Sequence, residues 1–170
     1  DEQPAKHIVW IPGNHSVKME AHWPGSMRWL SDISPRTNIL MNSHVTCEGL
    51  KIWGSPVTPW FHDWPWNVRR GPDIKKYWDM IPDDANIVVT HGPPHGVLDK
   101  VHPGTPWEDS VGCEELKKAM ARVKPKLMVF GHIHEGYGCQ LDQGTIYCNA
   151  SIMDTSYQPV HAPWELVIKI

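Results

Sequence analysis

Three short apolar runs in this chain each lead, within three residues, into a polar side chain that can bind a metal. The runs are residues 8–11, 87–89 and 127–130, and the polar residues that follow them are Asn14, His91 and His132. Short runs rich in β-branched residues and bounded by Gly, Pro or polar residues predict buried strands. Because α/β folds collect their sites at the rim of a sheet where strands end, we expect the three segments to converge.

Further segments indicate how the rest of the chain folds. Apolar residues at helical spacing, an acidic first turn and Pro125 just beyond it predict a helix over residues 114–123. Similar patterns predict helices at 19–32 and 73–80, strands at 51–53 and 166–168, a hairpin of 137–141 with 145–149, and a closing strand over 165–170. Strands mixed with helices and followed by a hairpin predict one α/β domain, spanning residues 1–170, with a mixed sheet or two packed sheets.

The charge pattern argues against two classes of partner. The net charge is −3, and the 16 basic and 19 acidic residues are mixed along the chain. We therefore expect no duplex nucleic acid and no membrane surface as partner. The sequence has neither a basic start followed by an apolar stretch nor an apolar run of membrane length, so it predicts a soluble, cytoplasmic protein.

The four cysteines contain no Cys-x-x-Cys pair, which argues against a structural zinc ribbon and a small disulfide scaffold. Two of them, Cys139 and Cys148, fall on the two arms of the predicted hairpin. A turn at residues 143–144 would place them opposite each other, whereas a turn over 142–144 would place Cys139 opposite Tyr147. The sequence leaves both registers open, and it predicts reduced thiols rather than a bridge.

The histidines after residue 130 are arranged for metal binding. If the chain stays extended beyond the strand, His132 and His134 project to the same side and can contact neighbouring ions. Imidazole suits zinc, iron or nickel, while manganese relies more on carboxylates. A single His is more often a surface or hydrogen-bonded core residue than a ligand. Three such segments, each after a predicted buried strand, are an improbable chance arrangement and favour a metal site.

These segments resemble the last three motifs of the calcineurin-like metallophosphoesterases. The likeness is greater to the metallophosphoesterase-domain-containing cyclic-nucleotide phosphodiesterases, and it runs from about His7 to the C-terminus. The segments that carry it are Gly-Asn-His at 13–15, Leu-Lys-Ile-Trp-Gly-Ser-Pro at 50–56, Thr-Pro-Trp-Phe at 58–61, Thr-His-Gly-Pro-Pro at 90–94, residues 129–138 and Asn-Ala-Ser at 149–151.

The resemblance implies a fold, a cofactor and a reaction. The fold is a four-layer α/β/β/α sandwich, and the cofactors are two divalent metal ions, with manganese, iron and zinc as the candidates. Asn14, His91 and His132 would hold the second ion and His134 would reach the first. A metal-bridging hydroxide would attack a phosphodiester, with cyclic nucleotides as the implied substrates, and His15 would protonate the leaving oxygen.

Two departures from the family pattern qualify this expectation. The aspartate-x-histidine and glycine-aspartate motifs of the family are absent, so the first site retains only His134, and the residue after His15 is Ser16 where an acid is usual. The sequence thus predicts an N-terminally incomplete family fold with an unpaired apolar sheet edge. Such an edge predicts a complementing N-terminal segment or self-association.

Residues outside the three motifs give further candidates and alternatives. Arg69, Arg70 and the loop over 60–66 are candidates for substrate contact, although a basic pair in a loop is more often solvated. His62, His95 and His102 are expected to be exposed. One alternative function is a catalytically silent module that binds one metal or a nucleotide. Another is a structural protein whose histidines cap strand ends.

Overall fold

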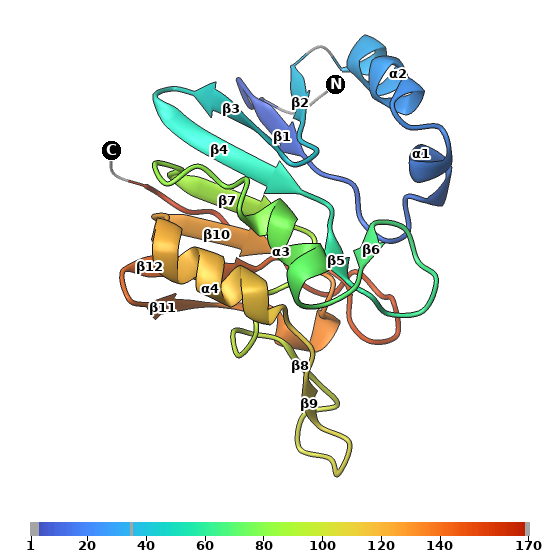
Figure 1. The fold of residues 1–170 in the computed structure, drawn as a ribbon, viewed down its shortest axis with the longest axis vertical. Coiled ribbons are helices and arrows are strands. Elements are labelled where there is room, and N and C mark those ends of the chain that lie inside the picture. The colour runs from blue at the N-terminus through green and yellow to red at the C-terminus, as the bar shows by residue number, and fades with distance from the viewer. Residues whose placement is uncertain (1–3, 35, 169–170) are drawn as a thin grey trace.

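The computed structural model describes residues 4–34 and 36–168, and its main element is a six-stranded mixed sheet (Figure 1). The strands run in the order β11-β12-β10-β7-β4-β3. Their bounds are β3 Ser43–Cys47, β4 Leu50–Ser55, β7 Ile87–Thr90, β10 Leu127–Phe130, β11 Gly138–Asp142 and β12 Thr145–Asn149. The four inner strands are parallel to one another, and β3 and β11 pair antiparallel at the two edges. The predicted α/β class with a mixed sheet is confirmed.

Two helices cover one face of this sheet, α3 (Pro72–Trp78) and α4 (Glu114–Val123) (Figure 1). The core between them and the strands is apolar, and Trp53 of β4 meets Trp78 of α3 edge to face at 6.1 Å between ring centroids. The apolar stripe predicted on α4 is buried as expected, at Leu116, Ala119, Met120 and Val123. The helices at 114–123 and 73–80 are therefore confirmed, the second with shifted bounds.

The opposite face carries a second, smaller layer of strands. Because successive side chains of a strand point to opposite faces, Gly54 faces away from α3 when Trp53 faces toward it. A Cβ at Gly54 would lie 2.7 Å from Leu40 Cβ and 2.9 Å from Ile11 Cγ2. These two residues follow the parallel strands β1 (Ile8–Trp10) and β2 (Thr37–Ile39), and the absence of a side chain at Gly54 lets the layers approach closely.

Helices α1 (Val17–Ala21) and α2 (Gly25–Ile33) lie beyond this pair in Figure 1. The layers thus follow the α/β/β/α order, with two strands in the second sheet among the described residues. The helical stretch predicted around residues 19–32 is confirmed in part, since it is divided into α1 and α2 by residues 22–24, which include Pro24. Proline has no N–H to donate and its ring clashes with the carbonyl four residues earlier, so the helix cannot continue through it.

The remaining strand predictions had mixed outcomes. The strands at 8–11, 51–53, 87–89 and 127–130 and the hairpin of 137–141 with 145–149 are confirmed. The closing strand is wrong, because residues 165–168 lie in no strand and residues 169–170 lie outside the described part of the chain. Trp164 Nε1 donates to the backbone oxygen of Asn149 at 3.1 Å, so a side chain attaches this segment to the end of β12.

The long loops hold only short pairs, β5 (Thr58–Pro59) with β6 (Asn67–Val68) and β8 (Lys100–Val101) with β9 (Asp109–Ser110). A 3₁₀ turn, η1 (His134–Gly136), precedes β11. None of the helices within the described residues has the length and apolar character that a bilayer span requires.

The predicted reduced state of Cys139 and Cys148 is wrong, since the two residues form a disulfide. The hairpin turns at Gln143 and Gly144, both with positive φ, and pairs Cys139 directly with Cys148 at a Cα–Cα distance of 4.3 Å. Two central residues with positive φ define the tight turn whose twist matches a hairpin. The other two cysteines, Cys47 and Cys113, are buried free thiols.

Alkylation with iodoacetamide in denaturant checks this assignment. Without reductant we expect two cysteines to be modified, Cys47 and Cys113, and with reductant all four, because only the bridged pair is protected in the unfolded chain. Four modified cysteines in both samples would contradict the bridge. If the bridge is present, peptide mapping of the unreduced sample should find the two unmodified cysteines joined as a disulfide within the hairpin segment.

Candidate metal and catalytic site

Asn14, His91 and His132 meet at the carboxyl ends of the parallel strands. His91 Nε2 lies 2.8 Å from Asn14 Oδ1, and the ring centroids of His91 and His132 are 4.7 Å apart with a 53° tilt. The predicted convergence of the three segments is therefore confirmed by the structure. Asn14 is buried, at 9% exposure, and both rings lie largely out of solvent.

The parallel ladder explains why these side chains meet. β7 lies between β4 and β10, and the ladder continues one step beyond the strands: the His91 N–H donates to Ser55 O at 3.2 Å, and the Gly131 N–H donates to His91 O at 3.0 Å. On the other side, a Cβ at Gly13 would lie 2.7 Å from His91 Cε1. Only glycine allows the loop that carries Asn14 to approach the His91 ring this closely.

The extended path predicted for the chain after β10 is wrong. His132 has φ 72° and is the central residue of a three-residue turn that the Ile133 N–H closes by donating to Gly131 O at 2.9 Å. Such γ-turns are uncommon and costly for a residue with a side chain. His134 then begins η1. The two rings are still close enough that the charge of one lowers the pKa of the other, although they do not lie along one strand face.

His15 and His134 both lie beside the Tyr157 ring. The Tyr157 ring centroid is 5.2 Å from that of His134 and 6.2 Å from that of His15, nearly perpendicular to both. Trp64 approaches His15 edge-on from the loop between β5 and β6, at 5.0 Å. His134 Nδ1 contacts the backbone oxygen of Asp154 at 2.7 Å. His15 remains exposed, so a substrate can reach it.

Reasoning from the sequence missed several residues that build this site. Tyr157 and Asp154 lie in a loop without a motif, and no pattern in the sequence pointed to them. Asn149 appeared only as part of a family-like segment. It is fully buried, and its Nδ2 donates to Ile133 O at 2.8 Å while its Oδ1 accepts the Ser151 N–H at 3.0 Å. Asn149 therefore fixes the backbone between His132 and His134.

Both inner histidines are held in the neutral form. Burial, followed by repulsion from the His132, His15 and His134 rings, lowers the pKa of His91 to about 3. The pKa of His132 is lowered to about 4 by the same causes, burial first and then the charges of His134 and His15. Neutral imidazoles present lone pairs, which is the state that a metal ligand requires.

These pKa values predict how stability depends on pH. Above the ordinary histidine pKa of 6.5, both rings are neutral in the folded and unfolded protein. As the pH falls below 6.5, the unfolded chain takes up protons that the folded protein cannot, so the free energy of unfolding decreases by up to about 1.4 kcal/mol per pH unit for each ring. The loss continues until His132 titrates near pH 4 and His91 near pH 3.

Urea unfolding of the metal-free protein between pH 7 and pH 4.5 measures this decrease. The variant His91→Asn should flatten the curve, because one of the two buried imidazoles is gone. Replacement of the exposed His44 by Gln is the control and should leave the slope unchanged. Equal slopes in His91→Asn and the parent protein would contradict the prediction.

The structure gives Arg70 hydrogen-bond partners outside the histidine cluster. Arg70 donates to Gly112 O and Val111 O, both at 2.7 Å, and to Glu114 Oε2 at 2.6 Å. These bonds use the guanidinium to tie the loop after β6 to the start of α4. Arg69 is exposed, as are His62, His95 and His102. The substrate-binding prediction for the two arginines stays a prediction. Arg69 is the better candidate, because the Arg70 guanidinium is already engaged in the hydrogen bonds named above.

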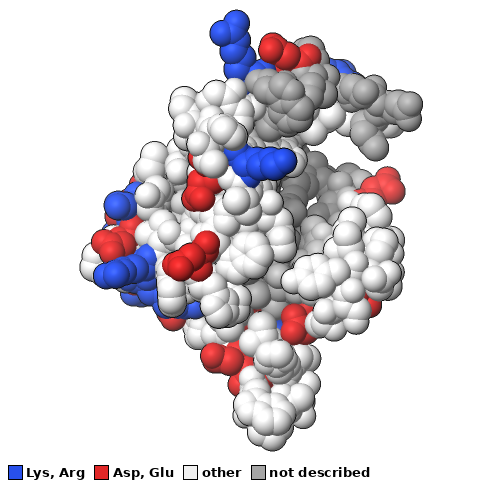
Figure 2. Space-filling view, turned by 90° about the vertical axis from the view of Figure 1, so that its right-hand side faces the viewer, with Lys and Arg blue, Asp and Glu red and all other residues white. Residues whose placement is uncertain are grey.

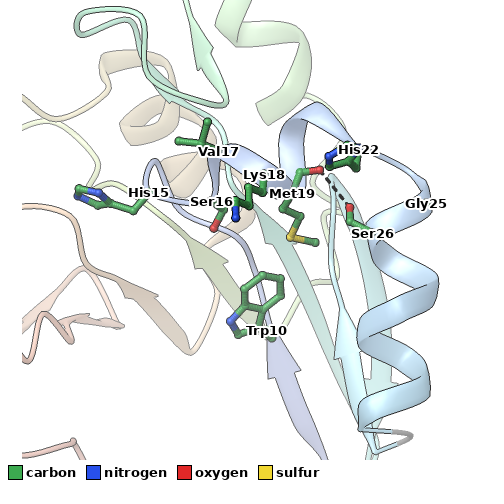
Figure 3. A pocket seen from close by; sticks show the side chains of 9 residues that line it. All are labelled: Trp10, His15, Ser16, Val17, Lys18, Met19, His22, Gly25 and Ser26. Atoms are coloured by element: carbon green, nitrogen blue, oxygen red, sulfur yellow. Dashed lines mark hydrogen bonds between the residues drawn. The ribbon is translucent and has the colours of Figure 1, made fainter.

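A large pocket lies beside this site without including its inner residues (Figure 3). Its volume is about 780 Å³, and Trp10, Met19 and His22 are among its lining residues. His15 stands at its margin with the ring turned away from Trp10 (Figure 3). Asn14, His91, His132 and His134 do not line it. The pocket and the cluster of Asn14, His91 and His132 at the strand ends are therefore separate features, and His15 lies between them.

The face to which the parallel strands point carries few charged side chains near its centre (Figure 2). On this face, shown in Figure 2, most described residues are uncharged, a group of Lys and Arg lies at its left-hand edge, and Asp and Glu are scattered over it. A phosphate arriving at the strand ends therefore meets the imidazoles, and bound ions when present, rather than a broad basic patch.

Asn14 Oδ1 and His91 Nε2 lie at a spacing that two ligands of one divalent ion would have. Two ligand atoms that each lie about 2.1 Å from one ion are about 3 Å apart when they are neighbours, close to the 2.8 Å between Asn14 Oδ1 and His91 Nε2. No group of three or more His, Cys, Asp and Glu residues in the described ranges is arranged to hold a metal. The nearby acids are engaged elsewhere, Glu135 with the His102 N–H and Asp154 within its own turn.

Fold and site together define a metallophosphoesterase-like arrangement, and comparison with known proteins agrees. Residues 2–136 match the family model described as calcineurin-like phosphoesterase. The chain belongs to this family, whose members bind divalent metals.

Relatives and a solved structure support the same assignment. The chain is 47% identical over 125 residues to human metallophosphoesterase domain-containing protein 1, which covers 73% of this chain and 37% of that protein. It is 32% identical over 179 residues to the UPF0046 protein C25E10.12 of Caenorhabditis elegans, covering 94% and 61%. A solved structure with 17% identity superposes with a TM-score of 0.61 over 84% of this chain and 56% of its own, which supports the fold alone. The chain spans about a third of the length of the human relative.

Proposed function

We propose that this chain is the catalytic portion of a metal-dependent phosphodiesterase that acts on cyclic nucleotides. The observation that carries the proposal is the contact of Asn14 with His91 at 2.8 Å, with the His132 ring beside them. Asn14, His91 and His132 would bind one divalent ion, and His134 would bind the other. Bound divalent ions supply positive charge that stabilises the phosphoryl oxygens and activates the attacking water.

The protein's own residues account for the remaining steps. His15 is exposed beside the inner cluster and is suited to donate a proton to the leaving oxygen. The edges of Trp64 and Tyr157 restrict the positions that its ring can take. A general acid of this kind contributes about 10²–10⁴ to the rate. The sugar oxygen released when a cyclic phosphodiester opens is a poor leaving group, so it benefits from such a proton donor.

The proposal is tested by metal counting combined with a hydrolysis assay. Hydrolysis of 3′,5′-cyclic AMP by the chain in the presence of Mn²⁺, with two ions bound, supports it. Phosphomonoesters should be poorer substrates under the same conditions. Two ions with hydrolysis of monoesters alone would rule out the phosphodiesterase assignment, and the assay with Zn²⁺ in place of Mn²⁺ would indicate which metal supports turnover.

A silent single-ion module is the second candidate, and one observation favours it. The site offers amide and imidazole donors, while the carboxylates near it in sequence are engaged elsewhere. Neutral donors balance little of the charge of two adjacent divalent ions. One tightly bound ion, no hydrolysis of either ester class and a raised unfolding midpoint with metal would favour this module.

A further inference from the structure

The loop after β12 forms a compact turn against the site, beyond the residues that match the family model. Asp154 organises this turn with its own side chain. Its Oδ1 accepts the Ser156 N–H at 2.8 Å and the Gln158 N–H at 2.9 Å, and its backbone N–H donates to Gln158 O at 2.9 Å. Side chains of Asp and Asn commonly fold turns in this way, because the acceptor oxygen replaces a backbone carbonyl.

The backbone oxygen of Asp154 points into the site and accepts two hydrogen bonds. One comes from the Tyr157 N–H at 3.0 Å, within the turn, and the other from His134 Nδ1 at 2.7 Å. A carbonyl oxygen can only accept, so Nδ1 of His134 carries the proton. The lone pair of the neutral ring is then on Nε2, the atom farther from the turn.

The same turn also contacts His15, through the side chain of Tyr157. Tyr157 has φ 57°, a left-handed conformation that is unusual for a residue with a side chain, and its ring lies edge-on to both His134 and His15. The bond from the Tyr157 N–H to Asp154 O helps to hold this conformation. One turn therefore sets the orientation of His134 through a hydrogen bond and limits the movement of both rings through Tyr157.

The segment that follows the turn, residues 161–164, packs on Tyr137. His161 stacks on Tyr137 with ring centroids 4.1 Å apart and an interplanar angle of 3°, and Trp164 stacks on the same ring at 5.0 Å. The Tyr137 hydroxyl donates to Ala162 O at 2.8 Å. Because Tyr137 directly follows η1, the turn and the segment of His134 are held by one set of aromatic contacts.

We propose that Asp154 is a positioning residue for His134. The turn that Asp154 organises holds the His134 ring so that its Nε2 faces the site. This inference rests on the proposed function, because it takes His134 to be a metal ligand. Hydrogen bonds from ligating histidines to carbonyl oxygens fix the ring orientation, and their loss commonly lowers metal affinity about 10- to 100-fold. The side chain of Asp154 acts through the turn and does not itself contact the metal or the substrate.

The test compares Asp154→Ala with Asp154→Asn in the full chain. Asparagine keeps the Oδ1 acceptor for the two backbone N–H groups and alanine removes it. ¹⁵N NMR of the metal-free protein, at a pH at which the rings are neutral, reports which nitrogen of His134 carries the proton. We expect Nδ1–H in the parent protein and in Asp154→Asn, and a mixture of tautomers in Asp154→Ala. Circular dichroism should show all three proteins folded.

Titration with Zn²⁺ provides the second measurement. The affinity should fall about 10-fold or more in Asp154→Ala and less than about 3-fold in Asp154→Asn. An unchanged tautomer in Asp154→Ala, or equal damage by both substitutions, would overturn the positioning role. A changed tautomer with unchanged Zn²⁺ affinity would support the positioning of His134 but exclude it as a ligand, so failure of the proposed function is distinguished from failure of this inference.

Discussion

Replacement of His91 by alanine is expected to lower the affinity for Mn²⁺ or Zn²⁺ by at least about 100-fold and to abolish any hydrolysis that depends on the ion. His91 is the central donor, since its ring contacts both Asn14 and His132. Loss of a hydrogen bond to a ligand alone costs about 10- to 100-fold in affinity, so loss of the ligand itself should cost more. Isothermal titration of the metal-free protein measures the change.

Two further variants make the His91 result specific. His91→Asn retains a polar group beside Asn14 and tests whether the loss reflects the imidazole lone pair rather than a collapsed cavity next to Gly13. His44→Ala removes an exposed imidazole on β3 and should leave metal affinity unchanged. An affinity within about threefold of the parent protein in His91→Ala, with the protein folded by circular dichroism, would exclude His91 from the metal site.

The convergence of the inner site was predictable because it depends on local patterns. Each ligand follows a short apolar strand, and parallel neighbouring strands bring their carboxyl ends to one rim. The ladder through Ser55, His91 and Gly131 is the direct consequence. Burial of the α4 stripe was predictable for the same reason, since one face of a helix repeats at fixed spacing.

The outer part of the site could not be predicted, because it depends on contacts between distant residues. Asp154 and Tyr157 meet His134 through a turn about twenty residues later, and the bond from His134 Nδ1 joins residues 20 apart. The γ-turn at His132 was missed because nothing in a Gly-His-x-His pattern indicates a positive φ at a residue with a side chain. The hairpin register was undecided for a similar reason, since the residues at 142–144 permit two turns and only the full pairing of β11 with β12 selects one.

Replacement of His15 by asparagine is expected to slow hydrolysis by an amount that depends on the leaving group. For a cyclic nucleotide, whose leaving alkoxide needs a proton, the rate should fall about 10²- to 10⁴-fold. For bis-p-nitrophenyl phosphate, whose nitrophenolate departs without a proton, the rate should fall less than about 10-fold, since the loss of a proton donor has little effect there. Steady-state rates on both substrates at one metal concentration measure the difference.

The structure supplies a matched control for this experiment in His22, the residue that caps α1. It is an exposed histidine that lines the same pocket as His15, and it lies outside the contacts that join His15 to Trp64 and Tyr157. His22→Asn should leave both rates unchanged. If His15→Asn reduced both rates by the same factor, His15 would orient the phosphoryl group or the bound ion rather than protonate the leaving oxygen, and the general-acid role would have to be abandoned.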